Sequence, residues 1–117
     1  MLNIQDKHIY LACGHTDMRK AINSLTLVVQ SSFELDPYEE AIFVFCNRSR
    51  NRLKILEWSG DGFWLHLKRL EKGHFKWPAQ GKEKTMDLTS EELHHLLGSP
   101  GLEQKLRRKE VVGQNVW

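Results

Sequence analysis

Residues 41–70 read AIFVFCNRSRNRLKILEWSGDGFWLHLKRL, and this stretch decides the fold. It holds three runs of strand-forming residues that two short polar turns separate. The first run, Ala41–Cys46, is continuously apolar, which predicts a strand near the sheet centre that is covered on both faces. Residues 53–59 and 63–70 follow, joined by Gly60-Asp61-Gly62, which suits a tight reversal with positive φ. The three runs therefore predict an antiparallel meander.

Towards the N-terminus, the sequence predicts one more strand and the main helix. Residues 8–13 form a short run of strand formers. A helix is predicted over residues 17–33, because apolar residues recur there at helical spacing. Thr16 is its predicted N-cap, and the carboxylate of Asp17 suits the positive end of the helix dipole. The helix should end before Asp36-Pro37, since proline restrains the residue ahead of it.

Beyond the meander, the pattern predicts a further short strand and a short helix. The aromatic run at residues 74–77 is interpreted as a strand that Pro78 stops. Residues 79–85 are polar and contain glycine, which is typical of a loop. Thr89 and Glu92 have the spacing of a capping box, so a short helix should begin there.

These elements together predict the α+β class. The expected architecture is an antiparallel β-meander packed against one main helix, with a short C-terminal helix. Residues 1–98 should form a single domain, because a chain of 117 residues buries about two thirds of its unfolded surface in one core. Residues 99–117 carry a charge run and little apolar support, and are predicted to be a tail that is mobile or docks on a partner.

Composition excludes several classes of protein. The hydrophobic fraction of 40% and the charged fraction of 27% are typical of a globular protein, and no apolar run approaches the ~20 residues that span a bilayer. The first residues are polar and have no signal-peptide character, so a cytoplasmic location is expected. Cys13 and Cys46 each lie in an apolar run, which favours reduced, buried thiols over a disulfide.

Charge is segregated along the chain although the net charge is only +2. Residues 48–76 hold eight basic and three acidic side chains, a net +5, and such a block is the footprint that phosphate backbones select. Three arginines alternate with small polar residues in the turn that begins this block, and guanidinium groups match phosphate oxygens well. The candidate nucleic-acid contacts are Arg48, Arg50, Arg52, Lys54, Lys68, Arg69, Lys76 and Arg19. A solvated, charged hairpin rim remains an equal alternative.

Arg19 is a candidate because it falls in the first turn of the predicted helix, where a positive charge opposes the helix dipole. A phosphate bound at that helix start would offset this cost. An exposed cation paired with Asp17 is the alternative interpretation.

No catalytic or metal-binding constellation is evident. Asp17, Asp61 and the pair Glu91-Glu92 are accounted for by a helix start, a turn and a cap. The six histidines show no zinc-binding spacing, and no glycine-rich phosphate loop lies between a strand and a helix. The sequence therefore predicts a protein that is not an enzyme and needs no cofactor.

An ordered set of motifs runs from residue 9 to residue 97. It comprises Ile9-Tyr10-Leu11-Ala12, Gly14, Thr16-Asp17-Met18-Arg19-Lys20, Phe43-Val44-Phe45, Arg48, Arg52, Lys54-Ile55-Leu56, Trp58, Gly60-Asp61-Gly62, Lys68-Arg69-Leu70-Glu71, Gly73, Phe75 and Trp77-Pro78. This set closely resembles the TnpB-type accessory protein, the second open reading frame, of the sixty-six family of bacterial insertion sequences. That protein is distinct from the RNA-guided nuclease that shares its name.

The resemblance implies a non-catalytic role in transposition beside a separate, larger transposase. The expected partners are the DNA of the element ends and the transposase of the same element. The basic block would bind DNA or the transposase–DNA complex; alternatively, the chain is an interaction module that docks on the transposase without touching DNA. An enzyme that uses Asp17 or Asp61 ranks third.

Overall fold

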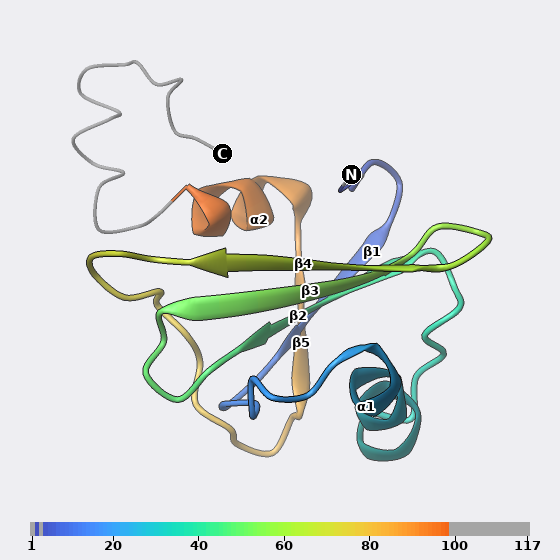
Figure 1. The fold of residues 1–117 in the computed structure, drawn as a ribbon, viewed down its shortest axis with the longest axis horizontal. Helices are drawn as coiled ribbons and strands as arrows, with labels where there is room; N and C mark the ends of the chain where they lie inside the picture. The colour runs from blue at the N-terminus through green and yellow to red at the C-terminus, as the bar shows by residue number, and fades with distance from the viewer. Residues whose placement is uncertain (1, 3, 99–117) are drawn as a thin grey trace.

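A computed structural model of the chain describes residues 2 and 4–98, and these form one mixed sheet with a helix on each side (Figure 1). The predicted tail at 99–117 lies outside the described residues. The elements in chain order are β1 (His8–Ala12), α1 (Ile22–Leu27) continuing as the π-helical turn η1 (Val28–Ser32), β2 (Ala41–Cys46), β3 (Arg52–Trp58), β4 (Phe63–Arg69), β5 (Thr85–Leu88) and α2 (Ser90–Leu97). The α+β class is confirmed.

The sheet has the strand order β4-β3-β2-β1-β5. The predicted meander is confirmed, because β2 pairs antiparallel with β3, and β3 pairs antiparallel with β4. On the other side of β2 lies β1, which runs parallel to it, as the connection through α1 permits. The edge strand β5 then pairs antiparallel with β1.

Both faces of the sheet are covered, which explains the uninterrupted apolar sequence of β2. Its side chains alternate between the two faces, and all six residues are buried. One face packs under α1 and η1, where Leu25 and Val29 meet Phe43 and Phe45. The opposite face packs under α2 through a second cluster that includes Val44. The prediction of a central strand covered on both sides is therefore confirmed.

The main helix begins later than the sequence predicted. No helix starts at Asp17, whose carboxylate forms a local turn by accepting the backbone N–H and the guanidinium of Arg19. Lys54 Nζ donates to the carbonyls of Met18 and Lys20, each at 2.7 Å. A helix beginning at Asp17 would use these carbonyls for its own hydrogen bonds. Thr16 is therefore not the N-cap, and the helix starts at Ile22 after an extended residue.

The segment after β4 also differs from the prediction. Residues 74–77 are not a strand: Phe75 turns into the core instead, and its backbone N–H bonds to the carbonyl of Arg50 at 2.7 Å. The predicted loop at 79–85 leads into β5, a strand that the sequence did not reveal. Because β5 is only four residues long and carries Asp87, its alternation is too short and too polar to recognise.

The capping box of α2 is confirmed, and it allows a test of the fold. Thr89 Oγ1 accepts from the N–H of Glu92 at 3.0 Å, and the Glu92 carboxylate accepts from the N–H of Thr89 at 2.8 Å. We expect Thr89→Ala to lower the free energy of unfolding by about 1 kcal/mol, because the N–H of Glu92 loses its side-chain acceptor at the helix start. Urea unfolding measures this loss, with Ser90→Ala as the neighbouring control. Equal effects of both substitutions would contradict the assignment of the cap.

Candidate nucleic-acid interface

The parallel pairing of β1 and β2 builds the candidate interface. Parallel strands end at the same margin of a sheet, so the loop at 13–20 and the turn at 47–51 lie together there. The N–H of Thr16 in the first connection bonds to the carbonyl of Cys46 at 2.7 Å. We call the surface formed by the loop 13–20, the turn 47–51 with Arg52 directly after it, and the adjoining segment 74–80 the basic rim.

The turn at 47–51 has a backbone fixed by its own side chains. Asn47 Oδ1 accepts from the N–H groups of Asn51 and Arg52 at 2.9 and 3.0 Å. Asn47 Nδ2 donates to Asn51 Oδ1 at 2.8 Å. Arg50 adopts a φ of 60°, a left-handed conformation that is uncommon for a residue with a long side chain. The turn therefore presents its arginines from a defined backbone.

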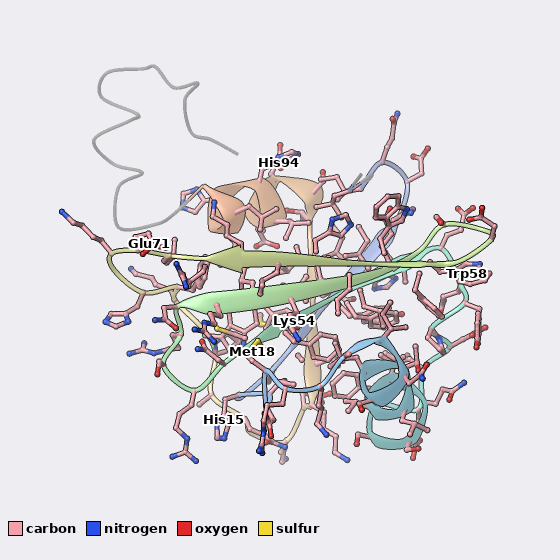
Figure 2. All side chains as sticks on the ribbon, viewed as in Figure 1. His15, Met18, Lys54, Trp58, Glu71 and His94 are labelled. Carbon is pink, nitrogen blue, oxygen red and sulfur yellow. The ribbon has the colours of Figure 1, made fainter. Side chains whose placement is uncertain are left out.

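Two open hollows flank Arg48 on the basic rim. One has a volume of about 500 Å³, and its walls include Asp17, Ser49 and Arg52. The other has a volume of about 410 Å³ and includes Arg50 and Trp77. His15 borders both hollows, and its Nε2 lies 3.5 Å from a guanidinium nitrogen of Arg48. Figure 2 labels His15 and Met18, which both belong to the loop 13–20.

A third hollow, of about 550 Å³, continues from the rim along the α1 face towards β4. Arg52 and Arg69 lie directly opposite each other across β3 and β4 and both line it. Like charges in this arrangement repel unless an anion or a carboxylate lies near. Glu71 supplies one carboxylate, at 2.8 Å from the guanidinium of Arg69.

The structure brings only some of the predicted contacts together. Arg48, Arg50 and Arg52 are exposed on or beside the turn, and Lys76 is exposed in the segment that runs along it. Arg69 is exposed at the end of β4 across from Arg52.

Three other predicted contacts have different surroundings. Lys68 points to the α2 face, where its ammonium donates to the carbonyl of Leu97, and burial lowers its pKa. The ammonium of Lys54 is engaged by the backbone before α1, as described above. Arg19 precedes the helix and is bound to Asp17, whose pKa the hydrogen bonds from Arg19 hold well below the usual range. The single footprint predicted from sequence is therefore divided between two faces.

Comparison with known proteins identifies the family. The model of the IS66 Orf2-like proteins matches residues 7–107. This chain belongs to the IS66 Orf2-like family. It is 35% identical over 104 residues to an uncharacterised protein of Sinorhizobium fredii strain NGR234, y4jC, covering 88% of this chain and 86% of the relative. A second uncharacterised protein of that strain, y4hO, is 43% identical over 75 residues, which span 64% of this chain and 65% of the relative. No solved structure matches the chain.

Family membership supports an accessory role in the transposition of IS66-type insertion sequences. The resemblance seen in the sequence is thereby confirmed. No helix in the described part of this IS66 Orf2-like protein has the length and apolar character needed to cross a membrane.

Sequence reasoning missed His15 and Gln80 as residues of the rim in this IS66 Orf2-like protein. Both border its hollows, beside Asn47 of the predicted basic turn and Trp77. Trp77 is half-buried and donates from Nε1 to the carbonyl of Ala12 at 2.9 Å. This bond ties the segment after β4 to the end of β1. The parallel register of β1 and β2 brings the loop 13–20 to the turn, and a hydrogen bond from Gly14 N–H to the carbonyl of Pro78 holds the segment 74–80 beside them. No local pattern in the sequence reveals these contacts.

The described residues offer little for catalysis. Across residues 2 and 4–98, no group of three or more His, Cys, Asp or Glu side chains is placed to hold a metal ion. Burial raises the pKa of Cys46 to about 12 and also raises that of Cys13, so both thiols are protonated at neutral pH. Asp61 accepts from the hydroxyl of Ser59 within its turn.

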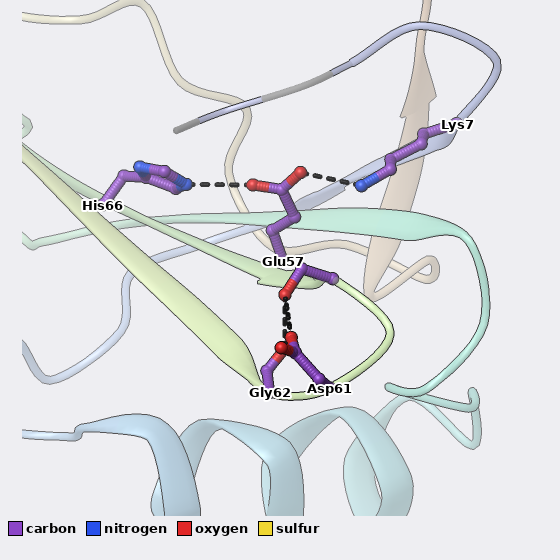
Figure 3. A network of polar contacts seen from close by, with 6 residues as sticks. Lys7, Glu57, Asp61, Gly62 and His66 are labelled. Atoms are coloured by element: carbon purple, nitrogen blue, oxygen red, sulfur yellow. Dashed lines mark hydrogen bonds and ion pairs between the residues drawn. The ribbon is translucent and has the colours of Figure 1, made fainter.

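The carboxylate of Glu57 in β3 is buried on the face of the sheet that α2 covers, and Figure 3 shows its contacts. Glu57 bonds to Lys7 Nζ at 2.7 Å and to His66 Nε2 at 3.0 Å. Because these partners balance a charge inside the core, the group fits a structural role.

Proposed function

We propose that this IS66 Orf2-like protein assists transposition by binding the phosphate backbone of DNA through the basic rim. One observation carries the proposal: three exposed arginines lie together on or directly after the turn 47–51, and none of them has a carboxylate partner among the described residues. Within the part of the chain that the structure describes, no ion pair joins Arg48, Arg50 or Arg52 to an acidic side chain. Arg19 and Arg69, by contrast, each have a carboxylate partner.

The chemistry of the rim fits phosphate better than a base edge. Guanidinium groups bind phosphate oxygens through paired hydrogen bonds, and the side chains of Ser49 and His15 add further polar groups beside them. The half-buried Trp77 is engaged with the chain itself, so the rim offers few side chains for reading bases. Binding should therefore depend weakly on DNA sequence and strongly on salt, with about 0.9 counterions released for each phosphate contacted.

The transposase of the same element is the second proposed partner. A rim that binds phosphate oxygens also binds surface carboxylates, because phosphates and carboxylates present similar pairs of acceptor oxygens to a guanidinium group. We therefore propose that the protein acts where DNA and transposase meet.

The direct test measures fluorescence anisotropy of labelled duplexes that carry the element's terminal repeat or a scrambled sequence. We expect the triple variant Arg48→Ala/Arg50→Ala/Arg52→Ala to lose on the order of 100-fold in affinity for both duplexes, which is about 2.8 kcal/mol in total and roughly 0.9 kcal/mol for each arginine, within the range of a net hydrogen bond. The salt dependence should become shallower in the same variant.

A matched triple variant controls for net charge. Lys72→Ala/Lys82→Ala/Lys84→Ala also removes three exposed cations, but these lie outside the turn, and it should keep most of the affinity. Equal losses of DNA affinity in the two triple variants would mean that net charge alone explains the effect. Failure of the unaltered protein to bind DNA at low salt would exclude the DNA contact and leave docking on an acidic transposase surface.

A further inference from the structure

The strand β4 is an edge strand with an open side. Among the described residues it pairs with β3 alone, in an unbroken register from Arg52–Arg69 to Trp58–Phe63. The hydrogen bonds Leu70 N–H to Asn51 O and Ser59 N–H to Gly62 O fix which residues face β3. In an antiparallel ladder these alternate, so the N–H and C=O groups of Phe63, Leu65, Leu67 and Arg69 point outwards.

Few of the usual protections against pairing are present on this edge. Natural edge strands are blunted by proline, bulges, short length, a covering helix or loop, or charged side chains, including inward-pointing ones. Across its seven residues, β4 has no proline, and its pairing with β3 shows no bulge. Its lysine, Lys68, is drawn back to the carbonyl of Leu97 at the end of α2. The other edge strand, β5, is only four residues long, and its Asp87 is paired with His8.

The exposed apolar surface of β4 flanks the same edge on both faces. Leu67 is 63% exposed on the α1 face, and Trp64 is 50% exposed on the α2 face. Both therefore lie where a strand added to the edge would cover them.

The sequence of β4 suits antiparallel pairing with a second copy of the same strand. It reads FWLHLKR, with two aromatic residues at the start, two cations at the end and a leucine on each side of the central histidine. In an antiparallel pair centred on His66, Leu65 lies opposite Leu67 of the second copy, and Phe63 opposite Arg69. On the other face, Trp64 lies opposite Lys68. Leu67 thus gains an apolar partner, and Trp64 lies opposite the aliphatic part of Lys68, whose ammonium stays bonded to Leu97.

The backbone geometry agrees with that register. The residues that pair as Phe63 with Arg69 and Leu65 with Leu67 are those whose N–H and C=O groups point outwards. The two strands would therefore exchange about eight backbone hydrogen bonds, two for each hydrogen-bonded pair. We propose that two copies of this chain pair antiparallel along β4, centred on His66, and join their sheets into one continuous sheet.

The proposal concerns a second copy and does not depend on DNA binding. An isologous twofold contact of this kind closes on itself and leaves no further β4 edge open. The basic rim stays outside the contact, because Arg48 and Arg50 lie in the turn before β3.

The first measurement is the mass of the full chain by sedimentation velocity, from about 1 µM to about 1 mM, a range that brackets weak protein pairs. We expect a dimer to form as concentration rises. Leu67→Pro removes an N–H that points away from β3, so it should keep the fold and weaken dimerisation at least tenfold. Leu67→Thr, the matched control, keeps that N–H and should retain the dimer. A monomer throughout, or a dimer that Leu67→Pro leaves unchanged, would overturn the proposal.

A cross-linking pair of variants tests the register and decides the matter if Leu67→Pro does not fold. His66→Cys places the thiols of two copies opposite each other in a non-hydrogen-bonded pair, about 4.5 Å apart at Cα, within disulfide reach. Mild oxidation should convert it to a covalent dimer. Trp64→Cys, on the same face, should stay monomeric under denaturing conditions, because its expected neighbour is Lys68 of the second copy. Cross-linking of both variants to the same extent, or of neither, would reject the register.

Discussion

Replacing Phe75 with alanine is expected to lower the free energy of unfolding by about 3–5 kcal/mol. The phenyl ring is fully buried, in the cluster that also holds Leu53, Leu70 and Leu93. Its removal leaves a cavity between the sheet and α2, and the surrounding strands can collapse into it only in part. Urea unfolding monitored by circular dichroism measures the loss as a lower midpoint at an unchanged slope.

Two further variants test the Phe75 prediction, one with a smaller change in volume and one at an exposed neighbouring position. Phe75→Leu keeps most of the volume and should cost less than about 1.5 kcal/mol, so it stays measurable if the alanine variant does not fold. Lys76→Ala, at the exposed neighbouring position, should change stability by less than about 0.5 kcal/mol. A cost for Phe75→Ala that matched that of Lys76→Ala would mean that the ring does not anchor this segment.

The same ring links the core to the basic rim. The N–H of Phe75 bonds to the carbonyl of Arg50, and Leu70 N–H bonds to the carbonyl of Asn51. The segment after β4 therefore runs along the turn that carries the arginines, with Phe75 as its apolar anchor. Stability of the core and order of the proposed DNA surface should fall together in Phe75 variants.

Local features of the sequence were sufficient to predict the centre of the fold. The meander follows from two short turns, because strands joined by such turns lie next to each other and pair antiparallel. The apolar run of β2 predicted its central place, since a strand covered on both faces has no polar side. The capping box at Thr89 was recognisable because both of its bonds lie within one helical turn.

Nonlocal pairing accounts for most of what the sequence did not predict. The parallel contact of β1 with β2 joins segments separated by the whole connection through α1, and nothing in either strand records it. That contact creates the rim, so His15 and Gln80 could not be linked to the arginine turn in advance. The late start of α1 has a similar origin, because it depends on Lys54, which reaches it from β3.

The division of the predicted footprint has a simpler cause. Side chains alternate along a strand, so the facing of Lys68 is decided by a register of one residue. The turn at 59–62 sets that register and pairs Lys68 with Leu53, whose side chain lies in the core under α2. A prediction based on nearness in sequence could not distinguish Lys68 from Arg69, which faces the other way.

Replacing Lys7 with methionine is expected to cost about 3 kcal/mol of stability, although Lys7 lies far from the rim. The carboxylate of Glu57 is only 2% exposed, and Lys7, itself 12% exposed, bonds to it at 2.7 Å (Figure 3). Removing one partner of such a pair leaves a charge in the core that water cannot reach. The double variant Lys7→Met/Glu57→Leu should recover much of the loss, because the buried charge is then absent as well.

Comparison of the single and double variants by urea unfolding separates charge burial from packing. Both variants lack the lysine ammonium, so a purely steric role for Lys7 predicts equal destabilisation of the two. Lys72→Met, at an exposed turn, controls for the loss of one positive charge and should be neutral within about 0.5 kcal/mol. A double variant no more stable than Lys7→Met would show that Glu57 is not held as a compensated buried charge.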